Sequence, residues 1–324
     1  MKKTIEYSEM VMPKKTLIFA FTTNLSLMTL EKAKFFAKHN CYIMCSLDGP
    51  KIIHDAYRVD IKGDGTFNKV IEGLKNLLIA FGDRAKTHIK FNVVICPPYS
   101  RKKLDAIKEF FDKLDYLPAG IDIKYSYVES GSLRKEDIDY TYFPEGEDII
   151  GDVPPIDIWL TEELPKQSSD QNVIFTLARD ALARVHKRFL LDHPCEKMKR
   201  NGCCIPGGRR IYVDIKGNIA LCERVGKSPS LGNINKGIDL EQVKRYYLEE
   251  YEKASVEQCK NCWAVNLCNM CYAACYRENG IDIEAKNELC TYQKDQLKGE
   301  LIMYHQVLET NPELLEHIQD IEII

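Results

Sequence analysis

The sequence predicts an α/β fold, part of a (β/α) barrel or sheet, followed by a small cysteine-rich region. Apolar runs of strand length alternate with amphipathic helical segments through the first 130 residues. Strands separated by helices in this way favour parallel pairing with crossover helices. Of the thirteen cysteines, ten follow Asp192, which marks a second region of different composition. The length of 324 residues is enough for about two domains, each with its own core.

The expected elements of the first region follow from hydrophobic periodicity. Strands are predicted at 17–22, 42–47, 89–95 and 121–128, and helices at 4–12, 30–38, 67–81 and 101–114. Thr29 is the expected N-cap of the helix at 30–38. The stretch between Pro50 and Phe67, which contains Gly63, Asp64 and Gly65, is predicted to be a loop. We find no internal repeat.

Polar residues stand where the predicted strands end. Asn24, Ser46, Asp48 and Glu129 are expected to share the face where ligands bind in parallel α/β architectures. Taken alone, Ser46 and Asp48 could equally cap a turn after a strand. His39 and His54 are assigned no role, since a lone histidine is usually structural or solvated.

The rest of the chain divides into a linker, a helix and the cysteine-rich part. Residues 130–169 are acidic and proline-rich and are predicted to be a linker or flap, and 172–191 a helix with a packing stripe. A β-hairpin is expected around Gly217, with Cys204 and Cys222 at its ends. A helix at 238–253, a loop running to Cys290 and a helix at 292–309 complete the chain. The predicted domains are 1–130, 131–192, 193–292 and 293–324.

Charge and composition argue against several classes of protein. The net charge is −3, and the basic run Arg101, Lys102 and Lys103 is too short to indicate nucleic-acid binding. No apolar run approaches the roughly 18–20 residues of a membrane helix. No export signal follows Met1, so a cytoplasmic location is expected. In that reducing compartment, clustered cysteines are metal ligands or catalysts more often than disulfides.

Five cysteines occur between Cys259 and Cys275, and with Cys204, Cys222 and Cys290 they exceed the needs of one tetrahedral site. A zinc site is one alternative, built from Cys259, Cys262, Cys268 and Cys271. The five residues between these two pairs are fewer than the ~15–20 usual in zinc ribbons. Tight C-x2-C-x5-C runs completed by a remote cysteine favour an iron–sulfur cluster.

This cysteine order resembles the SPASM domain of radical S-adenosylmethionine (SAM) peptide maturases. The matching positions are Cys204, Gly217, Cys222, Cys259, Cys262, Cys268, Cys271 or Cys275, and Cys290. The resemblance implies two auxiliary [4Fe–4S] clusters. Cys259, Cys262, Cys268 and Cys290 would hold the outer cluster. The inner cluster would use Cys204, Cys222 and either Cys271 or Cys275, with Cys195, Cys203 or an open position as its fourth ligand.

The N-terminal half resembles the same family. The run from Ser46 to Pro50, then His54-Asp55 and Arg58, is similar to the fourth strand and following loop of radical SAM barrels in sulfatase-maturating enzymes. The resemblance implies that Ser46 and Arg58 contact SAM, and it places Asn24 and Asp48 in the same cofactor-binding set. A strand-end hydroxyl and a guanidinium suit a carboxylate and a ribose.

The family's radical-generating C-x3-C-x2-C loop, which holds a third [4Fe–4S] cluster, does not occur in this sequence. Cys41 and Cys45 have the first spacing, but position 48 is Asp, and both are predicted to be buried thiols. We therefore expect a maturase truncated at its N-terminus. The intact family would abstract hydrogen from a ribosomally made peptide or protein, in some members forming thioethers, with flavodoxin or ferredoxin as electron donor. The rival interpretations are a non-catalytic iron–sulfur or peptide-binding fragment and a zinc-stabilised interaction module.

Overall fold

The computed structural model describes residues 1–128, 133–142, 155–167, 173–188, 204, 206–208, 210–224, 228–271 and 275–319. The chain forms two compact units. The first runs to Asp180 and takes in a later stretch that begins at Gln306, and the second runs from Ala181 to His305. Helices α8 (Val173–His186) and α12 (Ile283–Thr310) are continuous across these boundaries.

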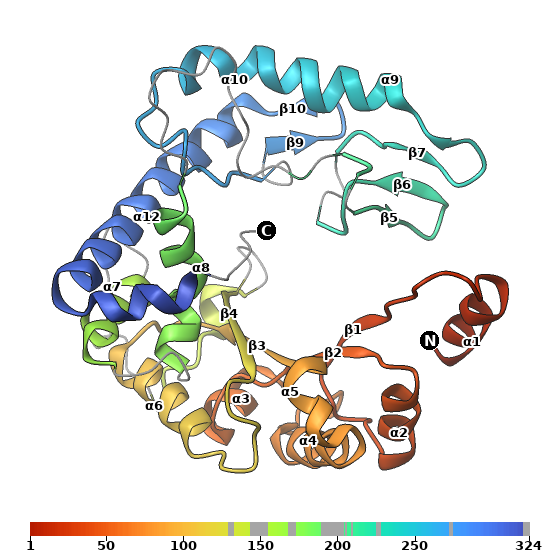
Figure 1. The fold of residues 1–324 in the computed structure, drawn as a ribbon, viewed down its shortest axis with the longest axis vertical. Coiled ribbons are helices and arrows are strands. Elements are labelled where there is room, and N and C mark those ends of the chain that lie inside the picture. The colour runs from red at the N-terminus through yellow and green to blue at the C-terminus, as the bar shows by residue number, and fades with distance from the viewer. Residues whose placement is uncertain are drawn as a thin grey trace. The chain divides into compact units, whose positions relative to one another are not determined.

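The first unit is built on a parallel sheet in the order β1-β2-β3-β4, formed by Ala20–Thr23, Tyr42–Ser46, Ile89–Ile95 and Asp122–Tyr127. The intervening helices are α2 (Leu30–Lys38), α4 (Phe67–Phe81) and α6 (Arg101–Asp112), which lie on one side of the sheet (Figure 1). Helix α1 (Lys2–Val11) precedes β1, and α5 (Ala85–His88) precedes β3. The predicted α/β class is confirmed.

Alternation of buried and partly exposed residues assigns the two faces of the sheet. On β3, the odd positions from Ile89 to Ile95 are all buried and the even ones are partly exposed. Phe91 on this buried face packs against Phe111 of α6, so the buried face is the one that the helices cover. The opposite face carries the even positions, which are mainly polar. Thr29 caps α2 as predicted, by accepting a hydrogen bond from the amide of Lys32.

Three expectations about helices are wrong. Helix α3 (Lys51–Tyr57) occupies part of the predicted loop, because Pro50 provides a compatible start for a short helix that lacks a clear period. Helix α7 (Pro155–Glu163) lies inside the predicted linker, and it packs Trp159 into the core with the indole donating to Asp105. Helix α12 begins at Ile283, so Cys290 lies within a helix and not at the end of a loop.

The second unit combines small antiparallel sheets with helices. Strands β5 (Tyr212–Val213), β6 (Asn218–Ala220), β7 (Gly232–Asn233) and β8 (Gly237–Ile238) pair in sequence order, and β9 (Tyr276–Arg277) pairs with β10 (Gly280–Ile281). The predicted hairpin turn is confirmed, with Asp214 accepting from the amides of Lys216 and Asn218. The predicted helix at 238–253 consists of α9 (Leu240–Gln242), a π-helix (Val243–Glu250) and α10 (Tyr251–Cys259).

Candidate functional site

Asp48 connects the end of β2 to its neighbours in the first unit. Its carboxylate is buried, accepts a 2.9 Å hydrogen bond from the amide of Val94 on β3, and receives two contacts from the Arg58 guanidinium, at Nε and at Nη2 (2.9 Å for the latter). Gly49 follows with a φ of 126°, a conformation that favours glycine. The pair that the sequence assigned to cofactor binding is thus engaged in holding β2, β3 and the end of α3 together.

His54 completes this network from α3. It is fully buried; its Nδ1 accepts from the amide of Asp48 (3.3 Å), and its Nε2 lies 3.2 Å from the Thr66 hydroxyl. Because Thr66 Oγ1 donates to the carbonyl of Arg58, it must accept from His54, which places the ring proton on Nε2. Burial lowers the pKa of His54, and the ring is neutral in this network.

Ser46, Asn92 and Lys124 form a row across the polar face of the sheet. They are consecutive partners in the register, Ser46 with Asn92 and Asn92 with Lys124, so their side chains leave the same face of neighbouring strands. Within the described residues, none of these three side chains makes a hydrogen bond or ion pair to the protein. The row consists of a hydroxyl, an amide and an ammonium, of which the hydroxyl belongs to the buried residue Ser46. Asn92 and Lys124 were missed by sequence reasoning, although the polar alternation of their strands could have indicated them.

A charged group lies beside this row. Lys90 on β3 and Asp122 on β4 form an ion pair at 2.7 Å, and Arg179 lies 3.6 Å from the same carboxylate. Burial alone would raise the pKa of Asp122, but the Lys90 hydrogen bond and the positive charges of Lys90, Arg179 and Lys124 hold it below its ordinary value. Asn24, by contrast, is exposed and caps its own turn by accepting from the amide and hydroxyl of Ser26.

In the second unit, the four thiols predicted to hold the outer cluster come together. Cys259 ends α10, Cys262 and Cys268 follow in turns, and Cys290 lies on α12. Burial raises the pKa of Cys259, the positive charge of Lys286 opposes this, and the nearby Cys290 and Cys262 raise the pKa further. Burial also raises the pKa of Cys268, to which Cys290, Cys259 and Cys262 contribute. Residues distant in sequence therefore form one electrostatic group.

The thiols of the other predicted set are divided by burial. Cys222 and Cys275 are buried in one core cluster with Tyr247 and Tyr276, and Cys268 and Cys290 pack against that cluster. Cys271 and Cys204 are exposed. Cys195, Cys203 and Glu129 lie outside the described residues. As predicted, Cys41 and Cys45 are buried; burial raises the pKa of both, to about 11 for Cys41.

The donor set of the second unit consists of thiols, which both zinc and iron–sulfur clusters take as ligands. Among the described residues, no three Cys, His, Asp or Glu side chains are placed to hold a single metal ion. Ser255 lies one turn before Cys259 on α10, is buried, and has a hydroxyl without a partner in the part of the chain that the structure describes. A buried hydroxyl without a partner fits a nearby ligand that accepts hydrogen bonds.

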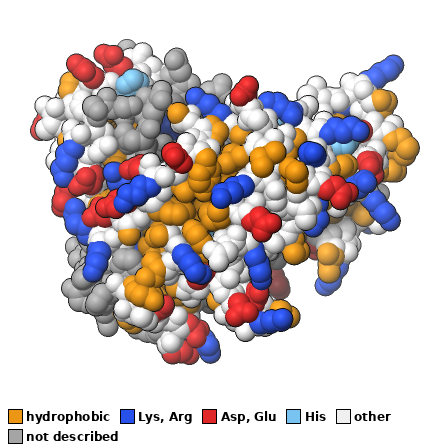
Figure 2. Space-filling model, turned by 90° about the horizontal axis from the view of Figure 1, so that it is seen from below, with side chains coloured by type: hydrophobic (Ala, Val, Ile, Leu, Met, Phe, Trp, Pro, Cys, Tyr) orange, Lys and Arg blue, Asp and Glu red, His pale blue; other side chains and the backbone are white. Residues whose placement is uncertain are grey.

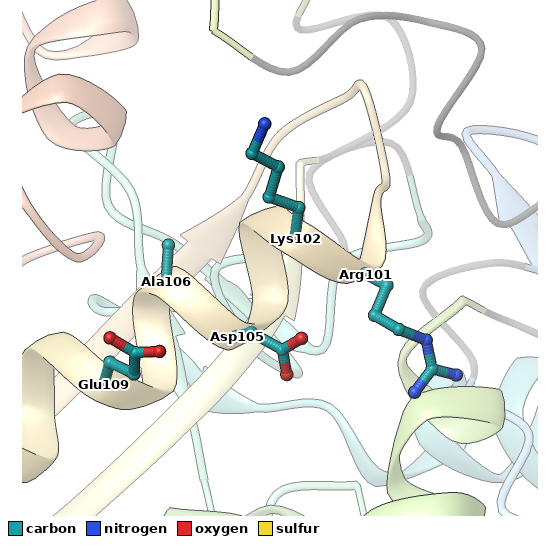
Figure 3. Close-up of a pocket in the computed structure, with 5 residues that line it drawn as sticks. All are labelled: Arg101, Lys102, Asp105, Ala106 and Glu109. Carbon is teal, nitrogen blue, oxygen red and sulfur yellow. The ribbon is translucent and has the colours of Figure 1, made fainter.

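The surface offers no stronger alternative among the described residues. A shallow hollow on α6 is lined by Arg101, Lys102, Asp105, Ala106 and Glu109, whose side chains project in different directions (Figure 3). Arg101 pairs with Glu162 there. Lys103 is buried and donates to the carbonyl of Cys96, so the basic run is not a continuous exposed patch. On the face in Figure 2, basic and acidic side chains are interspersed. No described helix is long and apolar enough to cross a membrane.

Comparison with known proteins places this fold in a class. No family model matches the chain. A cysteine-type anaerobic sulfatase-maturating enzyme of Clostridium novyi is 36% identical over 98 residues, which cover 30% of this chain and 25% of that enzyme. A serine-type anaerobic sulfatase-maturating enzyme of Bacteroides thetaiotaomicron is 36% identical over 81 residues, 25% of this chain and 19% of its own length.

The solved structures match nearly the whole chain. The structure of anSMEcpe with bound AdoMet (SAM) matches with a TM-score of 0.60 at 19% identity. The match covers 99% of this chain and 77% of the anSMEcpe chain. The complex of anSMEcpe with AdoMet and the Cp18Cys peptide has a TM-score of 0.59 at 18% identity, with coverages of 98% and 83%. The chain thus has the fold of these anSMEcpe structures, and its predicted resemblance to sulfatase-maturating enzymes is confirmed. The curated relatives are matched over about a quarter of their length or less.

Proposed function

We propose that this chain supplies the SAM-facing sheet and the auxiliary iron–sulfur unit of a radical SAM peptide maturase. The observation that carries the proposal is the convergence of Cys259, Cys262, Cys268 and Cys290 from α10, the following turns and α12. These residues would hold one [4Fe–4S] cluster, which supplies electron transfer when bound.

For the inner cluster, burial favours Cys275 over Cys271. Cys275 shares a buried core with Cys222, and its thiol lies 3.5 Å from the carbonyl of Cys271. We propose Cys204, Cys222 and Cys275 as ligands, with Cys195, Cys203 or an open position for substrate as the fourth. Cys204 would have to be drawn in from an exposed position.

The first unit would bind SAM through the row of Ser46, Asn92 and Lys124. Lys124 offers a positive charge to the cofactor's carboxylate, and the Ser46 hydroxyl and Asn92 amide can bond to its polar groups. Asp48 and Arg58 act behind this row, by fixing the end of β2 and its position against β3. The proposed substrate is a ribosomally made peptide or protein, modified by hydrogen abstraction, and the proposed location is cytoplasmic.

Anaerobic reconstitution tests the cluster assignment. We expect the chain to bind iron and sulfide, and Cys290→Ala to lower bound iron by about one cluster, about four iron atoms, while Cys41→Ala does not, because Cys41 is a buried thiol of the first unit. Zinc without sulfide, or an unchanged iron content in Cys290→Ala, contradicts the assignment. Incubation with SAM and dithionite then separates the catalytic from the non-catalytic interpretation. 5'-deoxyadenosine formed by this chain alone would contradict its lack of a radical-generating site.

A further inference from the structure

Lys286 is a buried cation in the second unit whose presence the fold alone does not explain. Lys286 is 1% exposed and lies in the first turns of α12. Its ammonium donates to Gln258 Oε1 at 2.8 Å and lies 3.9 Å from Cys290 Sγ. Within the described residues, no carboxylate forms an ion pair with it. A buried charge without a counter-charge is costly, so this arrangement calls for an anion nearby.

The position of Lys286 identifies where that anion would be. Lys286 and Cys290 are four residues apart on α12 and therefore share a face. Gln258, its other partner, directly precedes Cys259 at the end of α10, and Cys290 Sγ also lies 3.8 Å from Gln258 Oε1. The ammonium thus lies beside Cys290 and bonds to the residue that precedes Cys259, whose pKa its charge lowers.

A second buried polar side chain, on α10, has no hydrogen-bond partner within the described residues. Ser255, one turn before Cys259, is 2% exposed, and its hydroxyl is unpaired within the described chain. Both groups can donate hydrogen bonds. Lys286 lies beside Cys290, and Ser255 lies one turn before Cys259 on α10. A four-thiolate iron–sulfur cluster is negatively charged and accepts hydrogen bonds at sulfur, and both properties influence its reduction potential.

We propose that Lys286 is a positioning residue that balances the negative charge of the cluster held by Cys259, Cys262, Cys268 and Cys290, and thereby raises its reduction potential. The inference rests on the proposed cluster assignment. Reduction adds one negative charge to the cluster. The fixed ammonium stabilises that reduced form more than the oxidised one, because the charge is buried and poorly screened.

Redox titration of the reconstituted protein, followed by electron paramagnetic resonance, tests this role. The signal of this cluster is identified by its loss in Cys290→Ala. We expect Lys286→Met to shift the reduction equilibrium at least about tenfold toward the oxidised form, which is about 59 mV for a one-electron couple. Lys286→Arg keeps the charge and should remain near the wild-type potential. Lys298→Met is the matched control, since Lys298 is exposed on the same helix and pairs with Asp295.

The outcomes distinguish the cluster assignment from the role of the Lys286 charge. A wild-type protein that binds no iron and sulfide refutes the cluster assignment itself. A wild-type potential in Lys286→Met, or equal shifts in Lys286→Met and Lys286→Arg, overturns the role of the charge. Should Lys286→Met fail to load iron, the iron content and thermal unfolding of the apo-proteins decide. The proposal is supported if Lys286→Met loses iron, Lys286→Arg keeps it, and the two apo-proteins unfold at the same temperature. Equal loss of iron in both variants overturns it.

Discussion

We expect the free energy of unfolding to fall measurably when either partner of the Asp48–Arg58 ion pair is removed. The Asp48 side chain is 5% exposed, and among the described residues Arg58→Met leaves its carboxylate with the Val94 amide as its one remaining partner. Breaking a buried pair costs about 3–5 kcal/mol. Because the Arg58 side chain is 24% exposed, we expect the lower end, about 3 kcal/mol. Asp48→Asn should cost about 1–3 kcal/mol, since the amide can still accept from Val94.

The two variants and their double mutant form a cycle that isolates the pair. We expect a coupling free energy of about 1–3 kcal/mol, in the range found for residues in contact. Urea unfolding of the apo-protein can be followed by the fluorescence of Trp159, which is buried in the first unit. Lys113→Met is the control, because the Lys113–Glu109 pair is exposed to solvent and its loss should leave the unfolding free energy nearly unchanged.

The outcome distinguishes two roles for Arg58. If Arg58→Met changes the unfolding free energy by less than about 1 kcal/mol and instead weakens SAM binding, the ion pair with Asp48 does not stabilise the fold as its burial indicates. In that case Arg58 acts through the cofactor. If stability falls as expected, the direct contact of Arg58 with SAM that the family resemblance implied is not needed to explain its presence.

Two further predictions concern the same unit. The folded pKa of His54 lies below the ordinary 6.5, so its contribution to stability is complete above that pH and declines as the pH falls toward the folded value. The fall in unfolding free energy between pH 7 and 5 should thus be shallower in His54→Gln, and parallel curves would contradict this. Gly73→Ala should lower the unfolding free energy by about 1–3 kcal/mol, because a Cβ at this position would overlap the carbonyl oxygen of Leu25. The backbone at Leu25 has a φ of 61°, a conformation that L-residues rarely adopt. The adjacent exposed Glu72→Ala should change it by less than about 0.5 kcal/mol, and equal effects of the two variants would show that the close approach is unimportant.

Local patterns in the sequence were sufficient for much of the fold. Period-two and period-3.6 hydrophobicity predicted β3 and α4 at their observed bounds, because one buried face imposes that period on any strand or helix. The spacing of the cysteines indicated a C-x2-C-x5-C run completed by a remote cysteine, and the family resemblance named Cys290 for that place, which stays a prediction. Thiol clusters are rare enough that their spacing is informative without a structure.

Only the tertiary structure decided which groups meet. The row of Ser46, Asn92 and Lys124 depends on strand register, and register is set by pairing between segments that are distant in sequence. The commitment of Arg58 to Asp48 and the burial of Lys286 are likewise invisible in the sequence, where each is an ordinary charged residue. Their environment comes from packing, and packing determines whether a charge is solvated, paired or directed at a ligand.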